Sequence, residues 1–159
     1  MPDPSAEKMQ VRHMTAADVP RAMEIAASLP EAPHWTEAAY LNALNPESIP
    51  RRIALVAAGL RSEHVAGFAV ASILSQQAEL ESIAVSAGSQ QQGLGRMLFN
   101  GLVNQLRAAG VIEITLEVRA SNRPALAFYR SAGLDQTGLR PAYYADPIED
   151  AVLMRLQFS

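Results

Sequence analysis

Apolar residues recur along this chain with two different periods, and these periods predict its secondary structure. A four-residue spacing gives one apolar face to an expected helix that starts at Leu94 and ends before Gly110. The apolar positions of this helix are Leu94, Leu98, Leu102 and Leu106, widened by Phe99 and Val103. Strict alternation over residues 111–119 predicts a strand instead. Its expected inward side chains are Ile112, Ile114, Leu116 and Val118.

Shorter apolar runs bounded by Pro and Gly predict the remaining elements. We expect strands at residues 10–14, 51–58, 65–74, 78–85, 136–144 and 151–158, and helices at residues 16–28, 36–44 and 123–132. Thr15 is the expected N-cap of the first helix. Turns at Gly59 and near residues 76–77 favour antiparallel pairing of the three middle strands. The sequence predicts one α/β domain at residues 9–159, in the order βααβββαβαββ, after a flexible tail at residues 1–8.

Composition and charge exclude several classes of protein. The chain has 159 residues and no Cys, so disulfides, thiolate metal sites and a cysteine nucleophile are excluded. Its formal net charge is −3 and Lys8 is its one lysine, which disfavours a nucleic-acid-binding protein. Without a signal peptide or an apolar run of about twenty residues, a cytoplasmic protein is expected, with no membrane partner. We expect a monomer or a homodimer and no metal ion.

A glycine-rich loop at residues 90–96 is the first candidate for chemistry. It reads Gln-Gln-Gln-Gly-Leu-Gly-Arg, between an expected strand and an expected helix. Gly93 and Gly95 let the backbone bring several N–H groups to one anion, and the helix adds its positive N-terminal end. Arg96 stands where a nucleotide-triphosphate loop needs Lys, and Leu98 stands where a dinucleotide fingerprint needs Gly. The loop alone therefore predicts a phosphate site and no particular reaction.

Four motifs in order make the chain resemble the GCN5-related N-acetyltransferase (GNAT) superfamily. They are Ile-Ala-Val at residues 83–85, Gln-x-x-Gly-x-Gly at residues 90–95, Leu-Glu-Val-Arg-Ala-Ser-Asn at residues 116–122, and Phe-Tyr-Arg-Ser-Ala-Gly at residues 128–133. Their order and spacing are similar to those of the RimI-type branch, which acetylates the N-terminal alanine of a small-subunit ribosomal protein. The resemblance implies an α/β (α+β) GNAT fold, a mixed and mostly antiparallel sheet flanked by about four helices.

The resemblance also implies acetyl transfer from acetyl-CoA to an amine, by direct attack. The expected acceptor is the α-amino group of a protein that begins with alanine, such as a ribosomal protein. The cofactor-binding residues that carry over from the family are Ile83, Ala84, Val85, Gln91, Gln92, Gly93, Leu94, Gly95, Arg96 and Asn122. Family members commonly have a basic residue early in the loop, whereas this chain has three Gln. Backbone N–H groups and Arg96 are therefore expected to bind the pyrophosphate.

The catalytic roles come from the same branch. Glu117 carries over as the base that takes a proton from the amine, and Tyr129 as the acid that protonates the leaving thiolate. Asn122 and Tyr129 are seven residues apart, so they share one helix face about 10 Å apart. Glu79 is the alternative base, because the histone-acetylating branch has its base at the matching position. An N-terminal amine has a pKa of about 7.7–8.0, so more of it is already neutral near pH 7 than of a lysine side chain, and a weaker base is sufficient.

The acceptor site has four candidate residues. Glu81 alternates with Glu79 onto one face of its strand, where carboxylates attract a cationic amine. Trp35 either contacts the acceptor or packs against the core. Tyr143 and Tyr144 are adjacent on one strand, so they do not both point into the core.

Two other functions stay open at this level. The chain could acetylate an internal lysine, a polyamine or another small amine, with Glu79 or Glu81 as base. It could also be a CoA-binding regulator without catalysis, although the presence of Tyr129 argues against this.

Overall fold

The computed structural model describes residues 7–158. Its strands are β1 (Met9–His13), β2 (Arg51–Gly59), β3 (Val65–Leu74), β4 (Gln77–Val85), β5 (Glu113–Arg119), β6 (Asp135–Tyr144) and β7 (Glu149–Gln157). Its α-helices are α1 (Val19–Ala27), α2 (Glu37–Ala43), α3 (Leu94–Ala108) and α4 (Arg123–Ser131), with 3-10 turns η2 (Ala16–Asp18) and η3 (Ala87–Ser89). The predicted order βααβββαβαββ is confirmed, with element ends shifted by up to three residues.

Only the last two residues of the predicted tail, residues 7 and 8, belong to the described part of the chain. Residues 1–6 lie outside the described part of the chain. Glu7 accepts hydrogen bonds from the backbone N–H groups of Arg61 and Ser62, in the turn between β2 and β3. Across residues 7–158, no helix is both long and apolar enough to cross a membrane.

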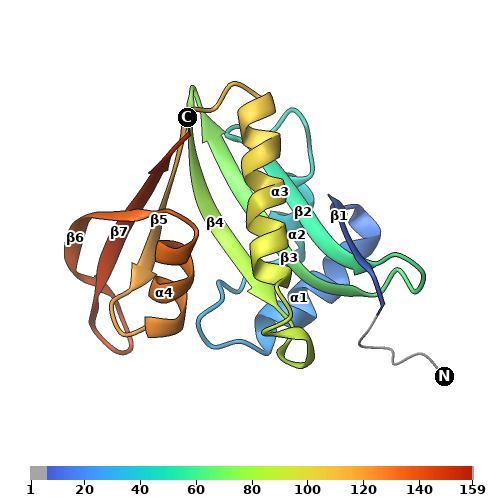
Figure 1. The fold of residues 1–159 in the computed structure, drawn as a ribbon, viewed down its shortest axis with the longest axis horizontal. Coiled ribbons are helices and arrows are strands. Elements are labelled where there is room, and N and C mark those ends of the chain that lie inside the picture. Colours follow the sequence, from blue (N-terminus) through green and yellow to red (C-terminus); the bar gives the residue numbers. More distant parts are fainter. Residues whose placement is uncertain (1–6, 159) are drawn as a thin grey trace.

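The seven strands form one sheet in the order β1-β2-β3-β4-β5-β7-β6. Every neighbouring pair is antiparallel except β4 and β5, which confirms the predicted mixed, mostly antiparallel sheet. Helices α3 and α4 cover one face, and α1 and α2 cover the other (Figure 1). Each face therefore has its own apolar core. We call them the α3 face and the α1 face.

Helix α3 shows why the predicted apolar stripe forms a helix here. The five side chains that face the sheet are each at most 3% exposed: Leu94, Leu98, Phe99, Leu102 and Leu106. Burying each one contributes about 1.5–3 kcal/mol, far more than intrinsic helix propensity. Gly67 of β3 allows this close approach, because a Cβ there would lie 3.1 Å from Cδ1 of Leu98.

One predicted inward position is wrong. Ile112 was expected to share the buried face of residues 111–119, but it is 52% exposed and β5 begins only at Glu113. The N–H of Val111 bonds to the carbonyl of Leu106, so the chain is still leaving α3 at this point. The alternation continues into the turn by coincidence, and the local backbone hydrogen bond decides the conformation.

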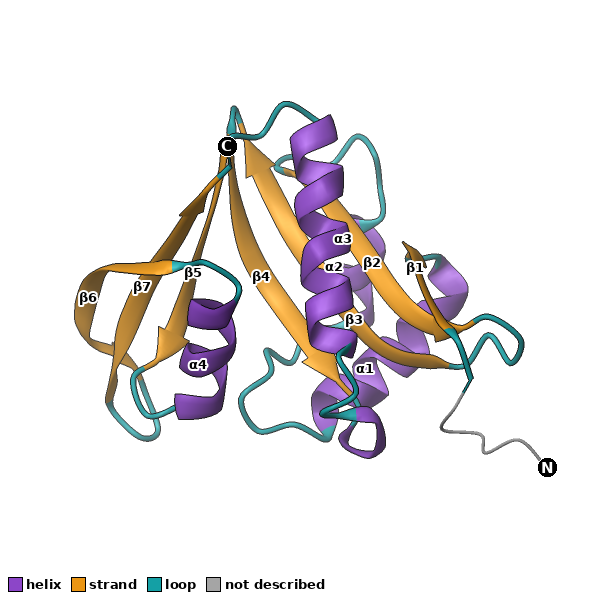
Figure 2. Ribbon diagram, in the orientation of Figure 1, coloured by secondary structure: helices purple, strands orange, loops and turns teal. Residues whose placement is uncertain are grey.

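Strands β4 and β5 pair only at their beginnings and then part (Figure 2). The last pair is Glu79 with Thr115. The pairing of β4 with β3 shifts register between Leu80 and Ser82, which leaves Glu81 as an extra residue, a β-bulge. A bulge bends its strand and increases the local twist, so β4 turns away from β5. The carboxyl ends of two parallel strands are thus separated, with an unpaired strand edge on β4.

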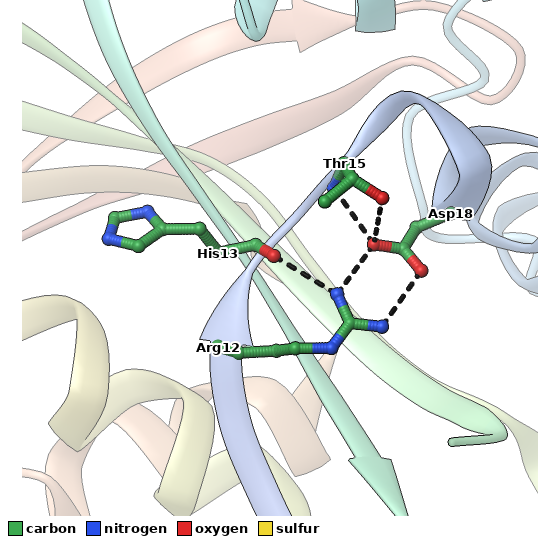
Figure 3. A network of polar contacts seen from close by, with 4 residues as sticks. All are labelled: Arg12, His13, Thr15 and Asp18. Carbon is green, nitrogen blue, oxygen red and sulfur yellow. Dashed lines mark hydrogen bonds and ion pairs between the residues drawn. The ribbon is translucent and has the colours of Figure 1, made fainter.

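A polar network fixes the start of α1 on the sheet. Asp18, which is 7% exposed, accepts hydrogen bonds from both terminal nitrogens of Arg12, at 2.7 and 3.0 Å. It also accepts from the N–H and the hydroxyl of Thr15, and Arg12 donates to the carbonyl of His13 (Figure 3). Thr15 is therefore the N-cap of η2, the short 3-10 turn that comes before α1. The apolar periodicity predicted η2 and α1 as one helix.

Replacing Asp18 with Asn is expected to lower the free energy of unfolding near pH 7 by about 2 kcal/mol, because Arg12 loses a charged partner. Hydrogen bonds from Arg12 lower the pKa of Asp18 in the folded protein. Its contribution is therefore complete above the unfolded value of about 3.9 and is lost as the pH falls through the folded value. Urea unfolding of parent and variant should differ at neutral pH and converge in acid.

The control for this experiment is Glu24→Gln. Glu24 pairs with Arg21 at 3.0 Å, but its side chain is 71% exposed. Removing an exposed pair changes stability by less than about 0.5 kcal/mol. Equal losses in the two variants at neutral pH would contradict the special role of Asp18.

Candidate functional site

A cleft of about 1000 Å³ occupies the place where β4 and β5 part. Every site residue predicted from the sequence lines this cleft except Gln92, which is exposed outside it. The structure therefore brings together residues from four distant parts of the sequence. These parts are Trp35, residues 79–96, residues 116–129, and the end of β6 at Tyr143 and Tyr144.

The two faces of the sheet give the cleft two chemically different sides. Ile114, Leu116 and Val118 of β5 belong to the core of the α3 face, so Glu117 and Arg119 point to the α1 face. On β4, Ala78 and Leu80 also belong to the α3 face, which leaves Glu79 on the other side. The glycine-rich loop and α4 thus border one side, and the carboxylates border the other.

The glycine-rich loop leads directly into the N-terminus of α3. Gly93 has a φ of +80°, a left-handed conformation that costs a residue with a Cβ roughly 1–2 kcal/mol. A Cβ at Gly95 would lie 3.6 Å from the Phe128 ring, so helix α4 packs close to the glycine-rich loop. Since the first N–H groups of a helix have no partner within it, the loop presents donors suited to the phosphates of CoA.

Two side chains of this loop have contacts that the sequence did not predict. Arg96 donates hydrogen bonds to the carbonyl and the hydroxyl of Ser131, at the end of α4. Gln90, absent from the predicted cofactor set, donates to the carbonyl of Val85 at 3.1 Å. Arg96 therefore connects α3 to α4 through one nitrogen, Nη2, while it also lines the cleft.

Helix α4 brings a buried tyrosine into the lining of the cleft. Asn122 caps this helix, because its Oδ1 accepts a hydrogen bond from the N–H of Ala125 at 3.2 Å. Tyr129 lies two turns further on and is 7% exposed. Burial, together with the neighbouring Tyr144, raises the pKa of Tyr129 far above its usual value. Tyr129 is therefore a neutral hydroxyl at neutral pH.

Three carboxylates lie along the other side of the cleft, each in a different environment. Glu81 accepts hydrogen bonds from Arg52 of β2, at 2.7 and 3.3 Å. Glu117 pairs with Arg140 of β6 at 3.5 Å. Glu79 is exposed, but partial loss of its hydration beside the cleft, followed by the negative charges of Glu117 and Glu81, raises its pKa. A raised pKa brings a carboxylate closer to the range in which it exchanges protons near neutral pH.

The tyrosine pair closes the end of the cleft at β6. The rings of Tyr143 and Tyr144 meet edge to face, with centroids 5.0 Å apart. The guanidinium of Arg119 lies 4.3 Å from the Tyr144 ring centroid, and that of Arg140 lies 5.4 Å from the Tyr143 ring centroid. Tyr143 is 50% exposed and Tyr144 is half-buried, so neither enters the core.

The segment between α1 and α2 is the main part of the site that the sequence missed. Residues 29–33 line the cleft beside Trp35, and Glu31 adds an exposed carboxylate there. Trp35 contacts the cleft and also packs on Tyr40, with ring centroids 5.4 Å apart, so both predicted roles apply to it. Pro30 and Pro33 marked this segment as irregular, but nothing local indicated that it faces β4 and β5.

The arrangement fits a reaction between a phosphate-bearing donor and an amine. The donor is accommodated by the glycine-rich loop and by the unpaired edge of β4, to which an extended amide-containing chain adds like a strand. The amine is accommodated by the carboxylates on the α1 face. Tyr129 lines the same cleft. Within residues 7–158, no group of three His, Asp or Glu side chains is placed to hold a metal ion.

Comparisons with known proteins agree with this arrangement. A family model described as "Acetyltransferase (GNAT) family" matches residues 19–134. The [ribosomal protein bS18]-alanine N-acetyltransferase of Salmonella typhimurium is 41% identical over 99 residues, which cover 61% of this chain and 67% of that one. A Bacillus subtilis protein named as a putative enzyme of the same kind is 31% identical, covering 92% of this chain and 94% of its own.

A solved structure extends the similarity to the fold. The ribosomal-protein-S18-alanine N-acetyltransferase from Escherichia coli superposes with a TM-score of 0.81. Its sequence is 32% identical, and the match covers 96% of this chain and 95% of that chain.

Replacing Gly93 with Ala is expected to weaken the binding of CoA roughly tenfold, because the strained loop withdraws its N–H groups from the phosphates. Open space surrounds the position, so a steric clash does not explain a loss. Titration calorimetry with CoA measures the effect. Gly88→Ala is the matched control, since Gly88 also has open space around it but has no left-handed φ. If Gly93→Ala only lowered the melting temperature and bound CoA normally, the loop would not be the phosphate site.

Proposed function

Because the chain belongs to the GNAT acetyltransferase family, we propose that it transfers the acetyl group of acetyl-CoA to the N-terminal α-amino group of a protein that begins with alanine. The observation that carries this proposal is the similarity, over nearly the whole chain, to the Escherichia coli structure named for that reaction and to the Bacillus subtilis protein named as a putative enzyme of the same kind. The expected acceptor is the corresponding ribosomal protein. We further propose that the enzyme acts in the cytoplasm, as a monomer or a homodimer.

The two-sided cleft supports a direct transfer. Acetyl-CoA supplies the acetyl group from the side of the glycine-rich loop, and the amine enters from the side of the carboxylates. A carboxylate, Glu117 or Glu79, takes a proton from the amine so that the nitrogen lone pair is free to attack. Tyr129, held neutral by burial, gives its proton to the departing thiolate. No covalent intermediate with the protein is needed.

An N-terminal α-amine suits this site better as an acceptor than the side-chain amine of lysine does. An N-terminal amine has a pKa of about 7.7–8.0 and lysine about 10.4, so the α-amine is far more often neutral near pH 7. A single carboxylate with a raised pKa is then a sufficient base. The exposed carboxylates Glu31 and Glu79 also favour cationic amines in general, which is why polyamines and lysine peptides belong in the test.

A panel of acceptors tests the proposed reaction. The protein is incubated with acetyl-CoA and either an alanine-initiated peptide, a matched peptide with a blocked N-terminus and one internal lysine, or a polyamine. Released thiol and the mass of the product are followed. Thiol release with the alanine-initiated peptide alone is expected. Release only with the polyamine or the lysine peptide would replace the proposed acceptor, and CoA binding without release would indicate a regulator.

Replacing Tyr129 with Phe is expected to lower kcat by about 100-fold, because the leaving thiolate loses its proton donor. The affinity for acetyl-CoA should change little, since the ring remains. Tyr40→Phe is the matched control, because Tyr40 is equally buried but lies outside the cleft and its hydroxyl has no partner within residues 7–158. Steady-state kinetics with the alanine-initiated peptide measures both. A Tyr129→Phe enzyme as fast as the parent would remove Tyr129 from the mechanism.

A further inference from the structure

The pairing of β6 with β7 is interrupted directly before the end of the tyrosine pair. Regular pairing stops at Arg140 and resumes at Tyr144. Residues 141–143 of β6 therefore face one residue of β7, Asp150. Pro141, the first of these three, has no N–H group to donate. Contacts from outside the ladder are therefore needed to fix the Tyr144 ring.

Arg119 supplies such a contact from the end of β5. Its guanidinium lies 4.3 Å from the centroid of the Tyr144 ring, and both side chains line the cleft. An arginine side chain has many rotamers, so it holds a ring in one place only when its own head group is fixed. Here Nη1 of Arg119 lies 3.4 Å from Oε2 of Glu149 and 3.4 Å from the carbonyl oxygen of Pro147. The start of β7 thus holds the Tyr144 ring through Arg119.

Glu149 makes a second contact with its other carboxylate oxygen. Oε1 accepts a hydrogen bond from the backbone N–H of Ser121, in the turn between β5 and α4. The N–H of Asn122 bonds to the carbonyl of Arg119 in the same turn, at 3.0 Å. Asn122 is the N-cap of α4, the helix that carries Tyr129. One carboxylate therefore contacts both the acceptor side of the cleft and the start of α4.

The surroundings of Glu149 suit this double contact. Its side chain is 15% exposed and lies outside the lining of the cleft, so it acts only through the residues that it holds. Hydrogen bonds from Ser121, followed by the pairing with Arg119, lower the pKa of Glu149, so its carboxylate is charged near neutral pH. A charged acceptor makes stronger hydrogen bonds than a neutral one. We call Glu149, Arg119 and Ser121 the hairpin bridge.

We propose that Glu149 is a positioning residue that holds Arg119 and the Tyr144 ring on the acceptor side of the cleft and the start of α4 on the donor side. This inference rests on the proposed acetyl transfer. The hairpin bridge fixes the tyrosine pair relative to Tyr129, so it aligns the acceptor amine with the group that protonates the leaving thiolate. Glu149 itself exchanges no proton and contacts no reacting atom.

Replacing Glu149 with Gln separates its two contacts. The amide oxygen of Gln still accepts the hydrogen bond from Ser121, but Arg119 loses its charged partner. The Tyr144 ring then loses support, so KM for the alanine-initiated peptide should rise about tenfold, while kcat changes less than about twofold. The affinity for acetyl-CoA, measured by titration calorimetry, should stay at the parental value. Steady-state kinetics gives the split between KM and kcat.

Replacing Glu149 with Ala removes both contacts. The start of α4 then loses a fixed point as well, so kcat should fall about tenfold in addition to the rise in KM. Arg119→Gln should raise KM as Glu149→Gln does, and combining these two changes should add little, because they delete the same contact. Additive effects, or a fall in kcat alone in Glu149→Gln, would overturn the inference.

Glu113→Gln is the matched control for Glu149→Gln. Glu113 pairs with Arg155 at 3.9 Å, so this pair also joins β5 to β7, and the Glu113 side chain is 12% exposed. Neither residue lines the cleft. The control should keep the parental KM and kcat. An equal rise in KM in the two variants would assign the effect to a general loosening of the sheet and overturn the role of the hairpin bridge.

The placement of the tyrosines is measured without any acceptor. The chain has four tyrosines, so NMR of ring-labelled protein gives few signals, which single replacements by Phe assign. Glu149→Gln should shift the ring signals of Tyr144 and leave those of Tyr40, in the core of the α1 face, in place. Glu149→Ala should shift the signals of Tyr129 as well.

The two readouts distinguish a failure of the hairpin bridge from a failure of the proposed function. Shifted Tyr144 signals in an enzyme that releases no thiol with the alanine-initiated peptide would contradict the proposed function alone. Parental Tyr144 signals and a parental KM in Glu149→Gln, with normal turnover of that peptide, would contradict the bridge alone.

Discussion

The parting of β4 from β5 is the constraint on which the rest of the site depends. Two parallel strands that begin as a pair would normally continue to bond, and their backbone groups would satisfy each other. The bulge at Glu81 ends this pairing after Glu79 and Thr115, so it exposes the β4 edge and creates the cleft in one step. Helices on both faces keep the separated strands in place, because each strand is anchored in an apolar core of its own.

The bulge also explains why the donor and acceptor sides differ in charge. Alternation places the apolar side chains of β5 on the α3 face, and places Glu79 of β4 and Glu117 of β5 on the α1 face. An anionic cofactor is therefore kept away from the carboxylates and is met by backbone N–H groups, which bind phosphate without a formal positive charge.

The sequence was sufficient for the fold order and for most of the residues in the cleft. Local patterns specify elements, and the ordered motifs identified residues such as Gly93 and Asn122, whose roles depend on their own loop or helix end. It failed where a hydrogen bond that the periodicity does not reveal decides the structure. Ile112 follows the alternation but is turned outward by the bond between Val111 and Leu106. The partner of Arg96 at the end of α4 has no signature at residues 90–96.

The sheet order shows why the acceptor side was the hardest part to predict. Strand β7 lies between β5 and β6, so Arg140 reaches Glu117 from a strand that does not pair with β5. This contact joins residues more than twenty positions apart, and it depends on the curvature of the hairpin rather than on any motif. The β6–β7 hairpin can therefore change the charge balance around the amine without disturbing the glycine-rich loop. Such separation lets one acetyl-CoA site serve different acceptors, because acceptor choice resides in elements that the cofactor does not need.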